Sequence, residues 1–278
     1  MMNTFQKSIF ALLILFLASP SKAEMFRFES QTQLVSHKAT IGGDLSFPGG
    51  QGPFPVVILL HPCGGLDQWA RTSLTSHAQA LKKAGFATYM LDSFSARGLT
   101  AEKVCRSGGE ATEFRLDDLL NARAALEKHP KIDKEKFFVL GQSHGAGVAL
   151  AAAFNQQTKP FRALAAFYPP CRGVLFTLPL KSPLIVFSGG KDDWTPVSSC
   201  EDAKGRERPS NSEEFILIVY PNAFHAFDQQ RQEPYKFLGH VLAYDTQATQ
   251  DSRKKMVDFF MSRRDDRSVS RSQTPPKN

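Results

Sequence analysis

The pentapeptide Gly141-Gln142-Ser143-His144-Gly145 is the segment whose residue types and spacing point most directly to chemistry. It fits the pattern G-x-S-x-G, in which a serine occupies a sharp turn between a strand and a helix. The sequence predicts both neighbours, an apolar strand over 137–140 and an alanine-rich helix over 146–154. Such a turn leaves no room for side chains at its glycines and lifts the serine hydroxyl above the sheet edge. We therefore interpret Ser143 as a nucleophile, with a plain glycine-rich turn as the alternative.

A serine hydroxyl attacks poorly until a base takes its proton, so a histidine must lie nearby. In this arrangement the base follows the acid late in the chain. Of the seven histidines, His225 and His240 lie beyond the Ser143 motif. His225 directly follows an apolar strand predicted over 215–220, whereas His240 lies in a segment with a helical pattern. We predict that His225 is the base and keep His240 as the alternative.

The acid is expected after the apolar strand predicted over 184–187, where Asp192 and Asp193 are adjacent. The spacing of Gly189 and Pro196 around Asp192 favours Asp192, and Asp193 is the alternative. The acid would hold the histidine in the correct tautomer and stabilise its imidazolium. The competing interpretation is that both carboxylates are solvated turn residues.

An acyl-transfer site also needs two backbone N–H groups directed at the carbonyl oxygen. One is expected from His144, the residue after the nucleophile. The other is expected from the turn after the apolar segment 55–60, most plausibly from Cys63. The following Gly64-Gly65 pair would let the backbone approach a substrate closely. A tight turn without this role remains the alternative.

These residues require a framework of alternating strands and helices, which the apolar patterns supply. Two antiparallel strands are predicted within 25–47, with a turn at Gly42-Gly43, and a long loop over 92–109. Alternation of this kind predicts an α/β fold with a mostly parallel sheet covered on both faces, as a single domain. The other strands are predicted over 55–60, 86–91, 137–140, 161–167, 184–187 and 215–220, and the helices over 69–84, 110–129, 146–154 and 246–262.

The N-terminal residues have the features of a signal peptide. Lys7 precedes the apolar run 9–18, and Ser21-Lys22-Ala23 places small residues where a signal peptidase cleaves. We expect cleavage after Ala23, an exported protein in the periplasm or outside the cell, and a domain over 24–262. An uncleaved anchor helix is the alternative. The polar residues 263–278 are predicted to form a disordered tail.

Charge and cysteine content narrow the classes of partner. The formal charge of the 278-residue chain is +7, and loss of Lys7 and Lys22 with the signal peptide would leave +5. The sequence has no clustered basic stripe that would favour binding to nucleic acid. After the N-terminal run it has no apolar window long enough to favour stable insertion into a membrane. The four cysteines contain no C-x-x-C pair that would favour a metal. An even number in an exported chain predicts disulfides, with three possible connectivities.

Taken together, these motifs resemble the dienelactone hydrolase family of α/β-hydrolases. The resemblance covers roughly residues 50–262 and rests on five segments, at 61–65 (HPCGG), 91–98 (LDSFSARG), 141–145 (GQSHG), 189–196 (GGKDDWTP) and 220–227 (YPNAFHAF). It implies an α/β-hydrolase fold with about eight strands and a minimal cap, no metal or cofactor, and hydrolysis of small esters or lactones. Ser143 stands where the best-known members carry cysteine, which moves the interpretation toward a serine esterase.

The resemblance also bears on substrate-binding residues. The family's arginine after its fourth strand corresponds to Arg97, which would bind a substrate carboxylate or brace its loop. Trp194, with Phe94 and Phe224, is expected either to line an apolar substrate pocket or to belong to the core.

The cysteines can be paired by position as a hypothesis. Cys63 and Cys105 lie in loops after neighbouring predicted strands, and so do Cys171 and Cys200. We hypothesise the disulfides Cys63–Cys105 and Cys171–Cys200, each bracing a loop that carries site residues. Free buried thiols are the alternative, less favoured in an oxidising compartment.

The sequence therefore predicts a carboxylic-ester hydrolase acting on a small-molecule ester or lactone. The alternatives are a peptidase on the same fold, a thioesterase or polyester hydrolase, and a non-catalytic binding module that retains the fold.

Overall fold

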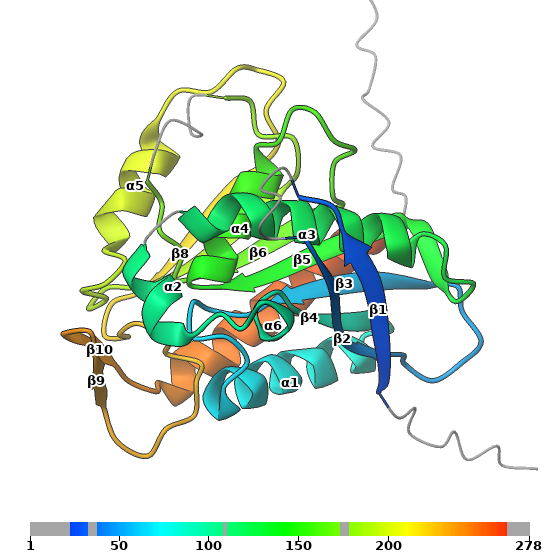
Figure 1. The fold of residues 1–278 in the computed structure, drawn as a ribbon. Coiled ribbons are helices and arrows are strands. Elements are labelled where there is room, and N and C mark those ends of the chain that lie inside the picture. The colour runs from blue at the N-terminus through cyan, green and yellow to red at the C-terminus, as the bar shows by residue number, and fades with distance from the viewer. Residues whose placement is uncertain (1–22, 33–37, 108–109, 173–177, 266–278) are drawn as a thin grey trace, which may run out of the picture.

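In the computed structural model, an eight-stranded sheet forms the centre of the molecule (Figure 1). The structure describes residues 23–32, 38–107, 110–172 and 178–265. Residues 1–22 of the predicted signal peptide (1–23) and residues 266–278 of the predicted tail (263–278) therefore lie outside the described residues. The spatial order is β1-β2-β4-β3-β5-β6-β7-β8. The first two strands pair antiparallel, and all pairs from β4 to β8 are parallel. The strands are β1 (Glu24–Ser30), β2 (Ala39–Ser46), β3 (Phe54–Leu60), β4 (Ala87–Asp92), β5 (Ile132–Gln142), β6 (Ala163–Phe167), β7 (Leu184–Gly189) and β8 (Phe215–Tyr220).

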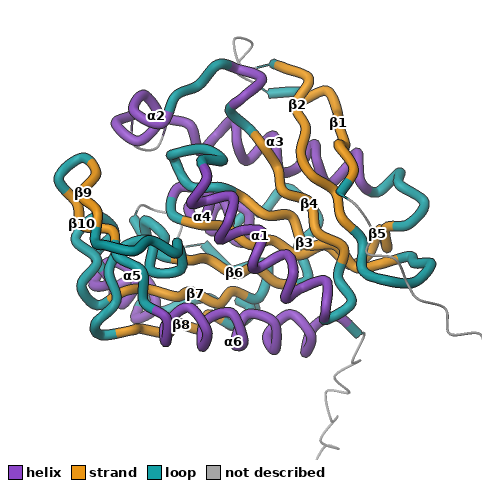
Figure 2. Tube along the Cα trace, turned by 90° about the horizontal axis from the view of Figure 1, so that it is seen from below, coloured by secondary structure: helices purple, strands orange, loops and turns teal. Residues whose placement is uncertain are grey.

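Helices cover both faces of this sheet, as Figure 2 shows in a second view. One face carries α1 (Gln68–Lys83) and α6 (Thr246–Arg264), and the opposite face carries α3 (Glu110–Leu126), α4 (His144–Ala153) and α5 (Val197–Gly205). A mostly parallel sheet between two helical layers, with an antiparallel start, is the architecture expected from the alternating sequence pattern. The chain therefore has the α/β-hydrolase fold.

The central strand β3 shows why the sequence forms this sandwich. Its run FPVVILL has no polar position, because alternate residues face the two helical layers. Val56, Ile58 and Leu60 pack with residues of α3 and α4, whereas Val57 and Leu59 pack with residues of α1 and α6. Full burial of each such side chain contributes about 1.5–3 kcal/mol, so the two cores hold the strand ends in fixed register.

Three predicted features differ in the structure. Gly42-Gly43 lies inside β2 rather than at a turn. Glycine is needed at position 43 because β4 approaches closely there, and a Cβ on Gly43 would stand 2.1 Å from the Met90 carbonyl oxygen. The predicted loop 92–109 contains a short 3-10 helix, η2 (Ser95–Arg97), and α2 (Ala101–Ser107). The helical pattern around His240 is wrong, since this residue begins β10 (His240–Leu242), which pairs with β9 (Tyr235–Phe237).

Local hydrogen bonds fix the starts of the two helices on one face. The Asp67 carboxylate accepts the Ala70 N–H at 2.8 Å at the start of α1, and Asp245 accepts the Ala248 N–H at 2.9 Å at the start of α6. Each such cap stabilises a helix by about 1 kcal/mol. In the described ranges no helix has both the length and the apolar character needed to cross a bilayer.

Candidate active site

Ser143 lies at the turn between β5 and α4, with φ 51° and ψ −116°. A non-glycine residue adopts such a positive φ only where its surroundings impose it. The tight turn around Ser143 requires glycine at its flanks, because a Cβ on Gly141 would lie 2.2 Å from the Gly145 carbonyl oxygen. A Cβ on Gly145 would lie 2.5 Å from the Leu60 carbonyl oxygen. The close approach of α4 to the ends of β5 and β3 therefore excludes side chains on both sides of Ser143.

The structure brings the three predicted triad residues into one hydrogen-bonded chain. His225 Nε2 is 3.0 Å from Ser143 Oγ, and His225 Nδ1 is 2.8 Å from Asp192 Oδ2. All three side chains are buried. They come from different loops at the carboxyl ends of β5, β7 and β8, which is where ligands bind in open parallel sheets.

Asp192 is held as an ionised acceptor by its own loop. Its Oδ1 accepts the N–H groups of Trp194 and Thr195, and its Oδ2 accepts the Thr195 hydroxyl at 2.8 Å. Burial alone would raise the pKa of this carboxyl, but the charge of His225 and these hydrogen bonds outweigh it and lower the pKa below its usual value.

Asp193, the alternative acid, faces a different part of the molecule. Its Oδ1 accepts the Val241 N–H at 3.2 Å and lies 3.5 Å from His240 Nδ1. Half of its side chain is exposed. The structure therefore associates Asp193 with His240 and Asp192 with His225.

A cavity of about 200 Å³ opens onto Ser143 and His225. Its lining is mainly apolar and aromatic, and Trp194 stands with its ring centroid 5.0 Å from the His225 ring. The other lining residues are Pro62, Cys63, Gly64, Asp67, Trp69, Ala101, Cys105, Tyr168, Ala226, Gln229, Arg231, Tyr235, Phe237 and Leu242. Such a site suits a small, largely apolar ligand.

Cys63, the predicted oxyanion donor, lies in this cavity wall in the turn after β3. Within the described part of the chain, its backbone N–H donates to no backbone carbonyl. His144, the second predicted donor, is the first residue of α4, so its N–H has no acceptor within the helix.

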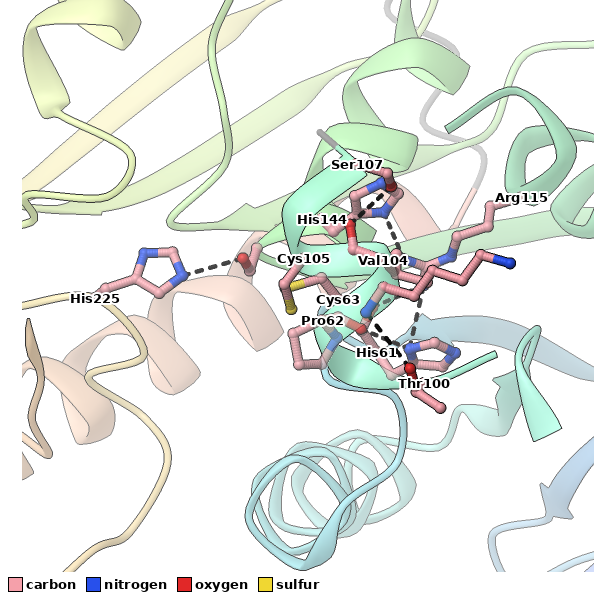
Figure 3. Close-up of a disulfide and its surroundings, with 12 residues drawn as sticks. His61, Pro62, Cys63, Thr100, Val104, Cys105, Ser107, Arg115, His144 and His225 are labelled. Carbon is pink, nitrogen blue, oxygen red and sulfur yellow. Dashed lines mark hydrogen bonds between the residues drawn. A yellow bond between two sulfur atoms is a disulfide. The ribbon is translucent and has the colours of Figure 1, made fainter. Parts of the chain in front are cut away.

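The structure contains the two disulfides hypothesised from the sequence, Cys63–Cys105 and Cys171–Cys200. The first joins the turn after β3 to α2 beside the Ser143 turn (Figure 3). The second joins the loop after β6 to α5, behind the Asp192 loop. No described cysteine is free.

Arg97 does not line the cavity. Its guanidinium binds both oxygens of Asp118 on α3, at 2.9 and 2.8 Å, and donates to the Ser93 carbonyl at 2.6 Å. These contacts agree with the loop-bracing alternative rather than with carboxylate binding. Phe94 likewise packs on the buried His61 ring, with 4.5 Å between the ring centroids, and belongs to the core.

Sequence reasoning did not find four residues that surround the site. Thr195 holds Asp192, and Tyr168 packs its ring edge-to-face on His225 at 4.8 Å. Arg231 lines the cavity between the rings of Trp69 and Tyr235. Arg115 lies buried behind Ser143. Its spacing of four and eleven residues from the apolar Leu119 and Leu126 was a signal that Arg115 faces the core.

The fold and this geometry define a hydrolase of the α/β-hydrolase class. The model of the dienelactone hydrolase family matches residues 41–263. The chain belongs to the dienelactone hydrolase family. No match was found among curated protein sequences.

Solved structures share the fold at low sequence identity. A dienelactone hydrolase-like promiscuous phosphotriesterase from metagenomic libraries is 19% identical, with a TM-score of 0.64, covering 87% of this chain and 99% of that one. A dienelactone hydrolase from Anabaena variabilis is 19% identical, with a TM-score of 0.57, covering 88% and 100%. An esterase from Pyrococcus furiosus is 16% identical, with a TM-score of 0.62, covering 87% and 94%.

Proposed function

We propose that this protein is an exported serine hydrolase that cleaves small carboxylic esters or lactones through an acyl-enzyme on Ser143. The observation that carries the proposal is the continuous chain Ser143–His225–Asp192 at the floor of an apolar cavity. The dienelactone hydrolase family supports the reaction class, and the two disulfides fit an oxidising compartment.

The first half of the reaction transfers the acyl group to the enzyme. Ser143 Oγ attacks the carbonyl carbon while His225 Nε2 takes the hydroxyl proton, and Asp192 stabilises the imidazolium. The negative charge on the carbonyl oxygen is received by the N–H groups of Cys63 and His144. Collapse breaks the bond to the alcohol oxygen, which leaves with the proton from His225.

The second half releases the acid. His225 takes a proton from water, whose oxygen attacks the acyl carbon, and the same N–H groups receive the charge. Collapse frees the carboxylic acid and returns the proton to Ser143. His225 must be neutral to act as the base in both halves of the reaction.

The test compares the mature wild type with Ser143→Ala, using p-nitrophenyl acetate turnover and fluorophosphonate labelling. Ser76→Ala is the matched control, since Ser76 is a half-buried serine on α1 that donates to the Thr72 carbonyl. We expect turnover and labelling in the wild type and in Ser76→Ala, and neither in Ser143→Ala. Labelling that persists in Ser143→Ala would mean that another serine is the nucleophile.

A folded wild type that is neither labelled nor active would instead favour the binding-module alternative. For an active enzyme, a panel of aryl esters, lactones and thioesters of equal acyl length compared by kcat/KM then identifies the substrate class.

A further inference from the structure

Arg115 on α3 is a fully buried arginine directly behind the Ser143 turn. Its Nη2 donates to the His61 carbonyl oxygen at 2.7 Å, and its Nη1 donates to His144 Nδ1 at 2.7 Å. Its guanidinium also packs over the Phe94 ring at 4.9 Å. Figure 3 shows the side chain reaching from α3 to both histidines. One guanidinium therefore holds two segments that are 83 residues apart in the sequence.

These two segments carry the backbone N–H groups that the proposed mechanism uses. His144 supplies one of them, and Cys63 follows the anchored His61 carbonyl by two residues. Gly145 packs on the same carbonyl from the other side, since a Cβ there would lie 2.6 Å from the His61 oxygen. Arg115 and Gly145 therefore fix the turn after β3 against the start of α4. The separation of the two N–H groups depends on that contact.

Within the part of the chain that the structure describes, the charge on Arg115 has no partner of opposite sign in contact with it. The carboxylates that act on it are Asp118, bound by Arg97, and Asp92, which accepts from Ser95. Among the described residues, no carboxylate forms an ion pair with Arg115. Burial accordingly lowers the pKa of Arg115 to about 9, although both carboxylates act in the opposite direction.

The two histidines beside Arg115 add no second positive charge. Burial and the charge of Arg115 lower the pKa of His61 to about 3, and its Nε2 accepts the Ser93 N–H at 3.3 Å. His144 Nδ1 must be unprotonated, because an arginine can only donate to it. A buried cation without a counterion is stabilised when negative charge develops close by. Because that negative charge develops on the carbonyl oxygen only in the transition state, this stabilisation lowers the activation barrier and accelerates the reaction.

We propose that Arg115 is a positioning residue for the oxyanion site. It holds the N–H groups of Cys63 and His144 at the correct separation and keeps a positive charge behind the oxygen that becomes negative. This inference rests on the proposed function. Its effect is on kcat and on transition-state binding, and substrate affinity changes little.

Arg123 provides a matched control on the same helix. It is buried, donates to the Lys159 carbonyl at 2.5 Å, and packs over the rings of Phe137 and Phe161. It therefore tests what the loss of a buried arginine from α3 does when its contacts lie away from Ser143.

The experiment measures kcat and KM for p-nitrophenyl acetate and the Ki of an aryl trifluoromethyl ketone, which forms an anionic adduct with the serine. Arg115→Met should lower kcat by roughly tenfold to 100-fold, somewhat less than the loss from removing an oxyanion donor itself. KM should change by less than about threefold, and Ki should rise by the same factor as kcat/KM falls. Arg115→Lys keeps the charge but cannot bridge both acceptors, so its kcat and Ki should lie between those of wild type and Arg115→Met. Arg123→Met should keep kcat within about twofold of wild type while losing stability.

A folded Arg115→Met with wild-type kcat would overturn the proposal, and so would a loss of kcat without a matching rise in Ki. Should Arg115→Met fail to fold, Arg115→Lys and His144→Leu decide, because His144→Leu removes the acceptor from the half-buried side of the contact. Both should show the parallel loss of kcat/KM and ketone affinity, and wild-type values in both would reject the role. An inactive wild type overturns the proposed function itself, whereas an active, Ser143-dependent wild type with an unaffected Arg115→Met overturns only this inference.

Discussion

At the scale of single residues, the adjacent carboxylates of Asp192 and Asp193 lie in different surroundings, which suit them to different roles. The side chain of Asp192 is fully buried, and its two oxygens accept hydrogen bonds from Thr195, Trp194 and His225. Asp193 is half exposed and faces His240 instead. A carboxylate oriented by fixed donors can hold the histidine in one tautomer, whereas a solvated one cannot.

Replacement of each aspartate by asparagine tests this division. Asp192→Asn should lower kcat by about 10³–10⁴, because the amide leaves His225 in the wrong tautomer. Asp193→Asn should change kcat by less than about threefold, since the exposed pair with His240 contributes little. Steady-state ester hydrolysis measures both, and the reverse order of effects would assign the acid to Asp193.

Residue identities could be predicted from sequence where a local motif carries the information. Ser143, His225 and Asp192 each follow a recognisable apolar strand, so spacing along the chain was enough to select three side chains that the structure brings within hydrogen-bonding distance. Arg115 and Tyr168 could not be found in this way. Their importance depends on groups that reach them across the fold, such as the His61 carbonyl on Arg115 and the His225 ring on Tyr168.

At the scale of elements, the contact of α4 with the end of β3 sets the geometry of the Ser143 turn. Gly145→Ala would place a methyl group 2.5 Å from the Leu60 oxygen and 2.6 Å from the His61 oxygen, so the helix must move. We expect a loss of stability of about 2–4 kcal/mol from this overpacking, together with a large loss of kcat. Gly205→Ala on α5 is the control, because nothing lies within 4 Å of its new methyl group. Urea unfolding and ester turnover measure both, and an active, stable Gly145→Ala would contradict the close contact.

The two disulfides join elements of different importance for the site. Removing either pair by double serine substitution should lower stability by about 2–4 kcal/mol. Only Cys63→Ser/Cys105→Ser should also lower kcat, because both cysteines line the cavity and Cys63 supplies a proposed oxyanion N–H. Cys171→Ser/Cys200→Ser should keep kcat close to wild type after correction for the folded fraction. Equal losses of kcat in the two variants would remove the link between the first disulfide and the site.

The major elements could be predicted because each strand from β3 to β8 contains a distinctive apolar run. The parts that could not be predicted are short and depend on tertiary contacts. The helix α2 is polar and is held by the disulfide of Cys105 and by Val104, its one buried apolar side chain. The hairpin β9–β10 has three residues in each strand, too few for a periodic signal.

At the scale of the whole molecule, Asp228 ties α1 to the ends of β5 and β6 beneath the site. Its Oδ2 accepts from His77 on α1 and from Gln142 at the end of β5, both at 2.7 Å, and its Oδ1 accepts the Tyr168 hydroxyl at 2.7 Å. Burial alone would raise the pKa of this carboxyl, but the hydrogen bond and charge of His77, with the other two donors, lower it below its usual value. The charged form of Asp228 is therefore part of the folded state.

Asp228→Asn should lower the free energy of unfolding at pH 7 by about 2–4 kcal/mol, because the buried donors lose a charged acceptor. The wild-type carboxyl has a lower pKa when folded than the 3.8 of an unperturbed aspartate, so its contribution is present above pH 3.8 and is lost as the pH falls through the folded value. The difference in the free energy of unfolding between wild type and Asp228→Asn should consequently narrow below about pH 4 and stay constant from pH 5 to 7. Urea unfolding across this range measures it, with the exposed Asp258→Asn on α6 as a control expected to shift stability by less than about 0.5 kcal/mol. A gap that did not change with pH would mean that the lost stability comes from the shape of the side chain and not from its charge.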